Sequence, residues 1–185
     1  MSSQSTKYSS VIIGLHWLSL ILMVLVYLSM ESRSLFERGS DARDLVKALH
    51  YSLALTLLLL TGFRVLARLL DKAPPIVPSP TMLAQRLTGL GHLLIYGWML
   101  GMILLGYLVL SLEGHDFQFW GLSVPLLTGE DSELAHQLED VHKLGATLGY
   151  YLIGGHALMA LWHHYGRKDN TLYRMLPLAK FKSGE

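Results

Sequence analysis

The chain has 185 residues, of which 51% are hydrophobic and 16% charged, and a mean hydropathy of +0.37, a balance typical of membrane proteins. A formal net charge of +1 gives no electrostatic footprint for nucleic acid and argues against nucleic-acid binding. The chain contains no cysteine, which excludes disulfides, thiolate metal sites and cysteine-ligated iron–sulfur clusters. Any redox cofactor must therefore use other ligands.

Four stretches are long and apolar enough to cross a hydrocarbon core of roughly 30 Å. They run over residues 11–30, 46–70, 87–112 and 144–165. A soluble four-helix bundle would carry a polar stripe along each helix, and these stretches lack one. The sequence therefore predicts an all-α membrane protein, a single domain over residues 1–185 folded as a four-transmembrane-helix bundle.

The positive charges predict how these helices are oriented. With the N-terminus in the cytoplasm, the inner segments hold ten Lys and Arg residues and the outer segments five, as the positive-inside rule requires. The first stretch is longer than the apolar region of a signal peptide and no small-residue cleavage site follows it, so we expect it to be retained. Both termini are therefore expected to be cytoplasmic.

The connecting segments differ in composition. The inner loop 71–86 holds four of the six prolines, which predicts a stiff, extended link. The outer loop 113–143 is the longest and most acidic, without the features of a separate domain. The tail after Gly166 mixes apolar and basic residues, and we expect it either to lie on the anionic inner leaflet or to be disordered. Its basic residues include Lys168, Arg174, Lys180 and Lys182.

Nine histidines are many for this length, and four of them fall at two levels of the predicted bundle. Ionisable side chains within membrane helices are costly and usually face the bundle interior, which makes them functional candidates. His16 and His156 lie near the inner ends of the first and fourth stretches, whereas His50 and His142 lie at the outer starts of the second and fourth. The sequence therefore predicts two histidine pairs, one near each membrane surface.

The spacing of His142 and His156 predicts how far apart the two levels are. Fourteen residues of helix rise about 21 Å and leave both side chains within roughly 40° of one face. Axial ligation of a b-type haem needs two neutral imidazoles on opposite sides of a porphyrin, and helices of one bundle can supply them. Glycines on the fourth stretch would leave room for the ring, although they also serve plain helix packing. These are Gly145, Gly149, Gly154 and Gly155.

The other histidines have weaker assignments. His92 is the main competitor for ligation at the inner level, and its alternative role is a hydrogen bond to a haem propionate or a neighbouring carbonyl. His163 continues the face of His156 about 10 Å nearer the cytoplasm, which suits a quinone headgroup or a proton relay. The rest are expected to be interfacial or solvated: His164, His115 and His136.

Two other interpretations of the histidines stay open. A zinc or proton transporter would also place histidines in helices, but it normally adds carboxylates at the midplane, and the four stretches contain none. A haem-free structural membrane protein would not be expected to pair histidines by level on separate helices.

Several segments resemble the bacterial cytochrome b561 family, and the resemblance covers nearly the whole chain. They are Gly14-Leu15-His16-Trp17-Leu18, Ala48-Leu49-His50, Gly91-His92-Leu93, Val141-His142-Lys143, Gly154-Gly155-His156, His163-His164-Tyr165, Lys168-Asp169-Asn170-Thr171-Leu172 and Arg174-Met175. The resemblance implies a bacterial inner-membrane bundle with two haem b groups. By position, His16 and His156 would ligate the inner haem iron, and His50 and His142 the outer.

The family also implies an activity. Its members pass electrons to or from quinone, so the resemblance implies an oxidoreductase between a periplasmic donor and the ubiquinone pool, with superoxide as the leading donor. The alternative is a cytochrome b membrane-anchor subunit of a dehydrogenase or hydrogenase, without activity of its own. The expected partners are the lipid bilayer, quinone and a small-molecule electron donor.

Charged residues near the two membrane surfaces are candidates for contacts with superoxide, haem propionates or quinone. The outer segments sum to −6 and would repel the superoxide anion at long range, unless four bases before His50 form a local cationic funnel. The alternative is that these bases pair with loop carboxylates; they are Arg33, Arg38, Arg43 and Lys47. The inner candidates for propionates or quinone are Arg86, His92 and His163, whereas Arg64 and Arg68 are expected to snorkel to the membrane surface.

Overall fold

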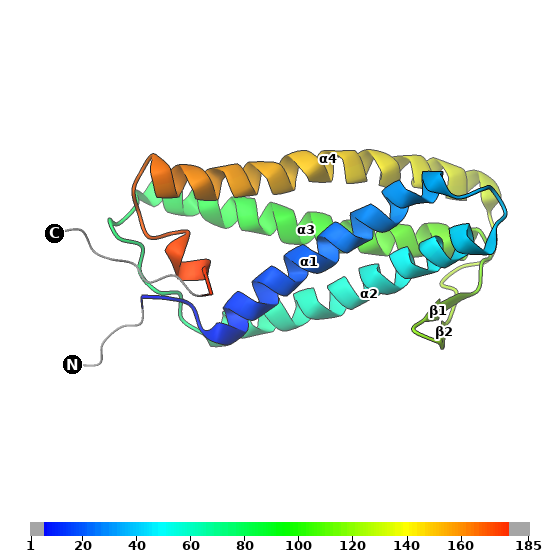
Figure 1. The fold of residues 1–185 in the computed structure, drawn as a ribbon, viewed down its shortest axis with the longest axis horizontal. Coiled ribbons are helices and arrows are strands. Elements are labelled where there is room, and N and C mark those ends of the chain that lie inside the picture. The colour runs from blue at the N-terminus through cyan, green and yellow to red at the C-terminus, as the bar shows by residue number, and fades with distance from the viewer. Residues whose placement is uncertain (1–5, 178–185) are drawn as a thin grey trace.

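The computed structural model describes residues 6–177 as four long helices and a short β-hairpin (Figure 1). The helices are α1 (Ser10–Ser32), α2 (Asp41–Leu70), α3 (Met82–Leu112) and α4 (Ser132–Tyr165). The strands are β1 (Phe117–Phe119) and β2 (Leu122–Val124), and two 3₁₀ turns are η1 (Arg33–Leu35) and η2 (Tyr173–Met175). Each long helix has the length and composition to cross a membrane. The predicted four-helix membrane fold is therefore confirmed.

Each long helix begins at a side chain that caps its free backbone N–H groups. Ser9, Ser40, Thr81 and Asp131 each accept a hydrogen bond from the backbone N–H three residues on. All four helices consequently start earlier than their apolar stretches, α1 by one residue and α4 by about three turns before residue 144. Hydropathy marks the part of a helix that lies in lipid, whereas the cap marks where the helix starts.

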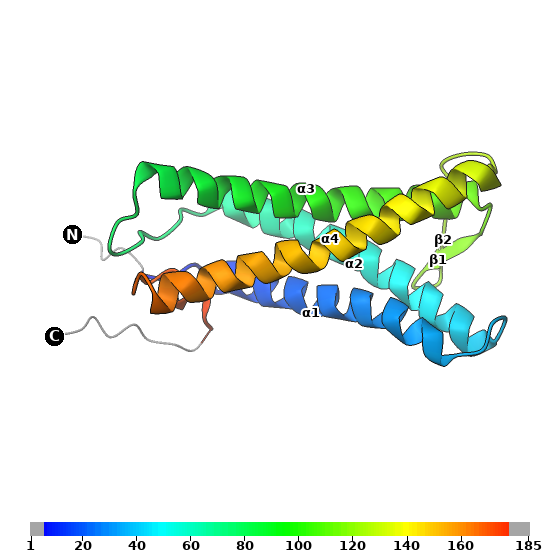
Figure 2. The same cartoon turned by 90° about the horizontal axis from the view of Figure 1, so that it is seen from above.

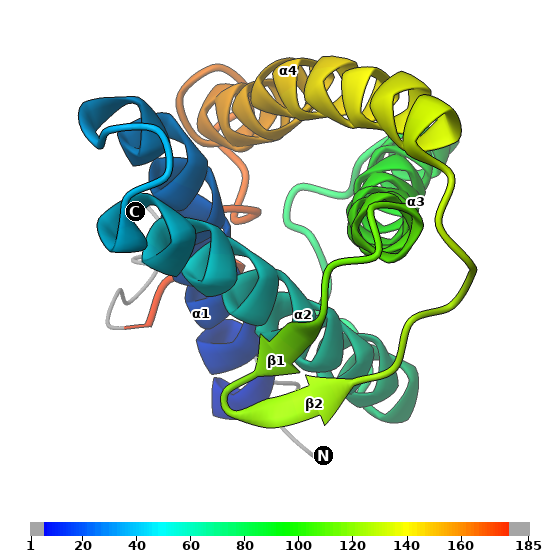
Figure 3. The same ribbon diagram turned by 90° about the vertical axis from the view of Figure 1, so that its right-hand side faces the viewer.

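The helices form two pairs, α1 along α2 and α3 along α4, as the end view shows (Figure 3). The start of α1 and the end of α4 lie at one end of the bundle, here called the terminal end, and the β-hairpin lies at the other, the hairpin end (Figure 2). Tyr27 of α1 joins the pairs by donating a hydrogen bond to the Ala146 carbonyl of α4 at 2.7 Å. Most large apolar side chains point outward, as expected of helices in lipid.

The acidic loop between α3 and α4 folds partly against α2. Phe117 on β1 is buried and meets the Tyr51 ring edge-on at 5.5 Å. The turn residues Trp120 and Gly121 both have positive φ, as the tight turn of a two-residue hairpin requires. The Trp120 indole N–H donates to Thr56 Oγ1 at 3.0 Å. The loop thus covers part of the bundle.

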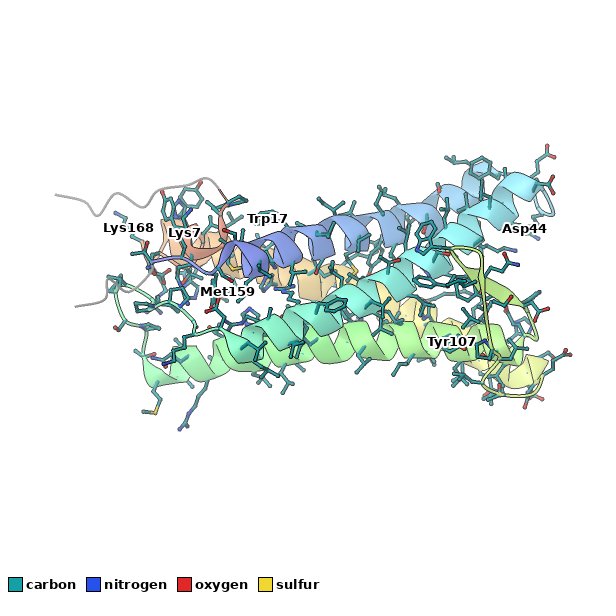
Figure 4. The ribbon with its side chains drawn as sticks, turned by 90° about the horizontal axis from the view of Figure 1, so that it is seen from below. Lys7, Trp17, Asp44, Tyr107, Met159 and Lys168 are labelled. Atoms are coloured by element: carbon teal, nitrogen blue, oxygen red, sulfur yellow. The ribbon has the colours of Figure 1, made fainter. Side chains whose placement is uncertain are left out.

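The segment after α4, residues 166–177, folds back over the terminal end and is here called the terminal cap (Figure 4). The Trp17 indole N–H donates to the Met175 carbonyl at 2.8 Å, and Arg174 donates to the Tyr8 hydroxyl at 3.1 Å. Arg174 is only 5% exposed, so neither expectation for the tail, leaflet binding or disorder, holds at this residue. Lys180 and Lys182 lie outside the described residues.

Asp169 and Asn170 attach the cap to α4 and to the proline-rich link. The His163 imidazole donates to the Asp169 carboxylate at 2.6 Å, and the Asn170 side chain accepts from the Val77 N–H at 2.9 Å and donates to the Pro75 carbonyl at 3.3 Å. Burial acts to raise the pKa of Asp169, but hydrogen bonds from His163 and Thr171 outweigh it and hold that pKa below its ordinary value. The link is thereby held in its extended form.

We expect Asn170→Ala to destabilise the protein by about 1–3 kcal/mol, because it leaves the Val77 N–H and the Pro75 carbonyl without their side-chain partner. Thermal unfolding of the detergent-purified protein, followed by tryptophan fluorescence, measures the effect as a lower midpoint. Gln85→Ala is the matched control, because it removes an exposed amide from a carbonyl of the same link. Equal midpoints for the two variants would contradict the assigned role of the cap.

Candidate functional site

At the hairpin end, α2 and α4 bring two histidines together. The ring centroids of His50 and His142 lie 6.4 Å apart with the rings at 83°. His50 Nδ1 lies 3.0 Å from the Val26 carbonyl, which fixes Nδ1 as the protonated nitrogen and leaves Nε2 as an acceptor. His142 Nδ1 is buried without a hydrogen bond of standard geometry. These two imidazoles therefore have unused nitrogen lone pairs in the bundle interior.

A cavity of about 1210 Å³ opens around this pair. Ordinary ligand pockets measure roughly 300–1,000 Å³, so the cavity is large enough for an extended cofactor. All four helices contribute to its wall, and charged residues of the loops contribute to its mouth. The wall includes Met30, Tyr51, Trp98, Met102 and Gly106.

At the terminal end, α1 and α4 form a second pair. The ring centroids of His16 and His156 lie 6.3 Å apart, and His16 Nδ1 is buried without a hydrogen bond. His92 of α3 lies near the same site, with its ring centroid 5.4 Å from that of His156. The structure thus brings together the four histidines that the sequence paired, with His92 beside the second pair.

Both pairs have the spacing that a metal between two imidazoles requires. A metal–nitrogen bond of about 2.0 Å, with the ring centre about 1.1 Å beyond the nitrogen, places two opposed ring centroids roughly 6 Å apart. The His16–His156 and His50–His142 separations meet this value, whereas the His92–His156 separation falls short of it. His92 instead has Nδ1 2.8 Å from the Thr88 carbonyl, the neighbouring-carbonyl role expected of it.

Glycines near the two sites have different surroundings. A Cβ on Gly106 would lie 3.0 Å from His142 Cε1, so α3 approaches that imidazole closely where it has no side chain. Side chains on Gly145 and Gly149 would instead overlap Met102 and Trp98, which makes these two positions helix contacts rather than space for a ring. Gly154 and Gly155 have open space beside them, as expected of residues that leave room for a cofactor.

Arg64 differs from its expected position. Its guanidinium lies 5.5 Å from the Tyr96 ring centroid, and its Nε is buried without a hydrogen bond. Tyr96 lies one turn of α3 after His92, whose ring centroid is 5.4 Å from that of His156. The expectation that Arg64 snorkels to the membrane surface is therefore wrong, because its side chain turns into the bundle toward the terminal-end pair.

The other terminal-end candidates lie apart from the pair. His163 is buried against Asp169 beneath the cap, and His164 contacts the rings of Tyr165 and Tyr173. Arg86 is exposed in the second turn of α3, about 9 Å along the helix from His92. Among residues 6–177, no group of three or more His, Cys, Asp or Glu side chains has the arrangement of a metal site.

The mouth of the cavity carries charges of both signs. Of the four bases in the first outer loop, Arg33 and Lys47 line it, while Arg43 donates to the Arg33 and Phe36 carbonyls and Arg38 is exposed outside it. Lys47 pairs with Asp44 at 2.9 Å. The mouth also includes Lys143, His115, Glu31, Glu113, Asp116 and Glu139.

Three residues that sequence reasoning did not assign also shape the site. Lys143, one residue from His142, reaches the mouth and pairs with Glu139 and Asp140. Tyr27 and Trp98 donate hydrogen bonds to α4 carbonyls four and three residues after His142, respectively, and fix that helix beside the cavity. Their signal in the sequence is weak, because an aromatic residue in a membrane helix is more often a lipid or packing contact.

Fold and site together define a multi-pass membrane protein with two half-buried pairs of neighbouring histidines, a class that includes membrane cytochromes. The model of the prokaryotic cytochrome b561 family matches residues 7–178, and the chain belongs to that family. The chain is thus a bacterial membrane cytochrome of electron transport, and the family binds haem b.

Curated relatives agree with this assignment. The chain is 37% identical over 171 residues to the "probable superoxide oxidase CybB" of Yersinia pestis, which covers 92% of the chain and 96% of the relative. It is 33% identical over 174 residues to "cytochrome b561 homolog 1" of Escherichia coli K12, covering 94% and 99%. "Cytochrome b561 homolog 2" of the same organism is 28% identical, covering 92% and 91%.

We expect Gly106→Val to lower the haem content of the purified protein, because the new side chain must displace the His142 imidazole. Overpacking of this kind costs about 1–3 kcal/mol, which corresponds to haem binding weaker by roughly tenfold. Gly101→Val, on the same helix with open space at its Cβ, is the control and should keep its haem. A pyridine haemochrome assay measures the ratio of haem to protein. Equal haem content in the two variants would contradict the close approach of Gly106 to His142.

Proposed function

We propose that the protein is a di-haem b membrane cytochrome that oxidises superoxide at the periplasmic surface and reduces ubiquinone. The observation that supports it most strongly is the pair of histidine sites, 6.3 Å and 6.4 Å between ring centroids, at opposite ends of the same bundle. His50 and His142 would hold one haem and His16 and His156 the other. Bound there, the haems supply one-electron transfer across the membrane.

The orientation we propose places the terminal end in the cytoplasm of the cell and the hairpin end in the periplasm. The excess of Lys and Arg at the terminal end supports it by the positive-inside rule. The haem levels would then lie about 21 Å apart across the inner membrane, the rise of fourteen helical residues.

The reaction balances with two electrons and two protons. Two superoxide anions each lose one electron and become dioxygen, while one ubiquinone takes up two electrons and two protons and becomes ubiquinol. His163 is our candidate for a quinone contact or a proton relay, because its imidazole lies at the cytoplasmic end against the Asp169 carboxylate. Arg86 and His92 are further candidates for contacts with quinone or a haem propionate.

Two observations support superoxide as the donor. A relative 37% identical to the chain carries the name probable superoxide oxidase. In addition, Arg33 lines the mouth of the cavity and forms none of the ion pairs found among the described residues. We propose that Arg33, with Lys47, attracts the anion to the haem at the hairpin end, despite the carboxylates nearby.

The haem assignment predicts that His50→Ala lowers the haem content from two b-type haems per chain to about one, because one axial ligand of the hairpin-end site is lost. His136→Ala, which removes an exposed histidine near the same end, is the control and should retain both. Spectra and a haemochrome assay give the count. Retention of both haems by His50→Ala would refute this pairing.

The donor assignment predicts that Arg33→Glu lowers kcat/KM for superoxide-driven ubiquinone reduction by about tenfold at low ionic strength, the scale of electrostatic steering. Arg38→Glu makes the same charge change outside the mouth and should have a much smaller effect. The assay uses purified protein without a partner subunit. If the wild type reduces no quinone alone but co-purifies with a dehydrogenase, the anchor-subunit alternative replaces this proposal.

A further inference from the structure

Arg64 occupies a distinctive place in the bundle. It lies fourteen residues after His50 on α2, the same spacing that separates His142 from His156 on α4. Since α2 and α4 run in the same direction, Arg64 lies on α2 at the level that His156 occupies on α4, about 21 Å from the His50 level. The terminal-end site thus has an arginine on α2 where the hairpin-end site has a ligand histidine.

The positive charge of Arg64 lacks a protein counter-ion. The described residues give it no carboxylate within ion-pair distance, and the Tyr96 ring, 5.5 Å away, offers only a partial cation–π interaction. Tyr96 lies one turn from His92, and the His92 ring lies 5.4 Å from that of His156, so the nearest titratable side chains of the terminal-end pair are histidines, which are neutral when they ligate a metal. A cation inside a membrane bundle is strongly disfavoured unless an anion joins it.

The neighbouring arginines, Arg68 and Arg174, have different surroundings from Arg64. Arg68, one turn further along α2, lies over the Tyr8 ring at 4.8 Å, and Arg174 of the terminal cap lies over the same ring at 4.9 Å. Of these three arginines, Arg64 alone lies over a ring of α3, that of Tyr96, one turn from His92.

We propose that Arg64 binds a carboxylate of the haem at the terminal-end site and raises the reduction potential of that haem. The inference rests on the proposed function, because it takes His16 and His156 as the ligands of that haem. A guanidinium presents paired N–H groups that match the two oxygens of a carboxylate. A fixed positive charge near the iron favours the reduced state, in which the iron centre carries one positive charge fewer.

The test is a redox titration of the purified protein, following the α-band of each haem. Arg64→Gln is expected to shift the equilibrium of one haem at least tenfold toward the oxidised form, which is 59 mV for a one-electron couple. The other haem should keep its potential. Arg64→Lys, which keeps the charge, should recover most of the shift, and the control Arg68→Gln should leave both potentials unchanged.

Each outcome decides the proposal. A variant Arg64→Gln with full haem and unchanged potentials overturns it, and so does loss of haem in both the Gln and Lys variants, which would show a packing role. If Arg64→Gln loses one haem while Arg64→Lys retains both, the result supports the proposal, because the site then needs the positive charge. A wild type with fewer than two haems would overturn the proposed function instead, independently of Arg64.

Discussion

A membrane interior contains no water to satisfy the nitrogens of an imidazole, and this constraint governs the bundle. The Nδ1 atom of His50 has a hydrogen bond to the Val26 carbonyl, and that of His92 has one to the Thr88 carbonyl. His16 and His142 each keep a buried nitrogen without a partner, yet each faces another histidine across a gap of one metal ion. A cofactor that joins these histidines, as we propose, would offset the cost of leaving their nitrogens unpaired and would thereby stabilise the bundle.

Helix α4 provides one histidine to each of the two pairs, and the rest of the architecture follows from that arrangement. Because α1 packs along α2 and α3 along α4, both histidine pairs join one helix pair to the other. Tyr27 and Trp98 hold α4 in register through its own carbonyls, and Gly106 lets α3 pass close to His142. The terminal cap and the β-hairpin then cover parts of the two ends.

The sequence was sufficient to predict the four membrane helices and the pairing of the four histidines, because hydropathy and the 3.6-residue period of a helix are local properties of the chain. It did not predict the inward turn of Arg64, since an arginine near a helix end snorkels in most membrane proteins and only the partner helix shows which way it points. The cap was also missed: the hydrogen bonds of Asn170 join it to a link more than ninety residues away, and no local pattern encodes them. The polar first turns of α4 were assigned to the outer loop for a different reason, because hydropathy marks only the part of a helix that lies in lipid.

The measurement that tests the central claim most directly is the amount and spin state of haem b in the purified wild-type protein. A haemochrome assay combined with electron paramagnetic resonance of the oxidised protein gives both. The account predicts about two haems per chain, each low-spin with two histidine ligands. A single haem per chain, or a high-spin signal from either haem in intact protein, would contradict it.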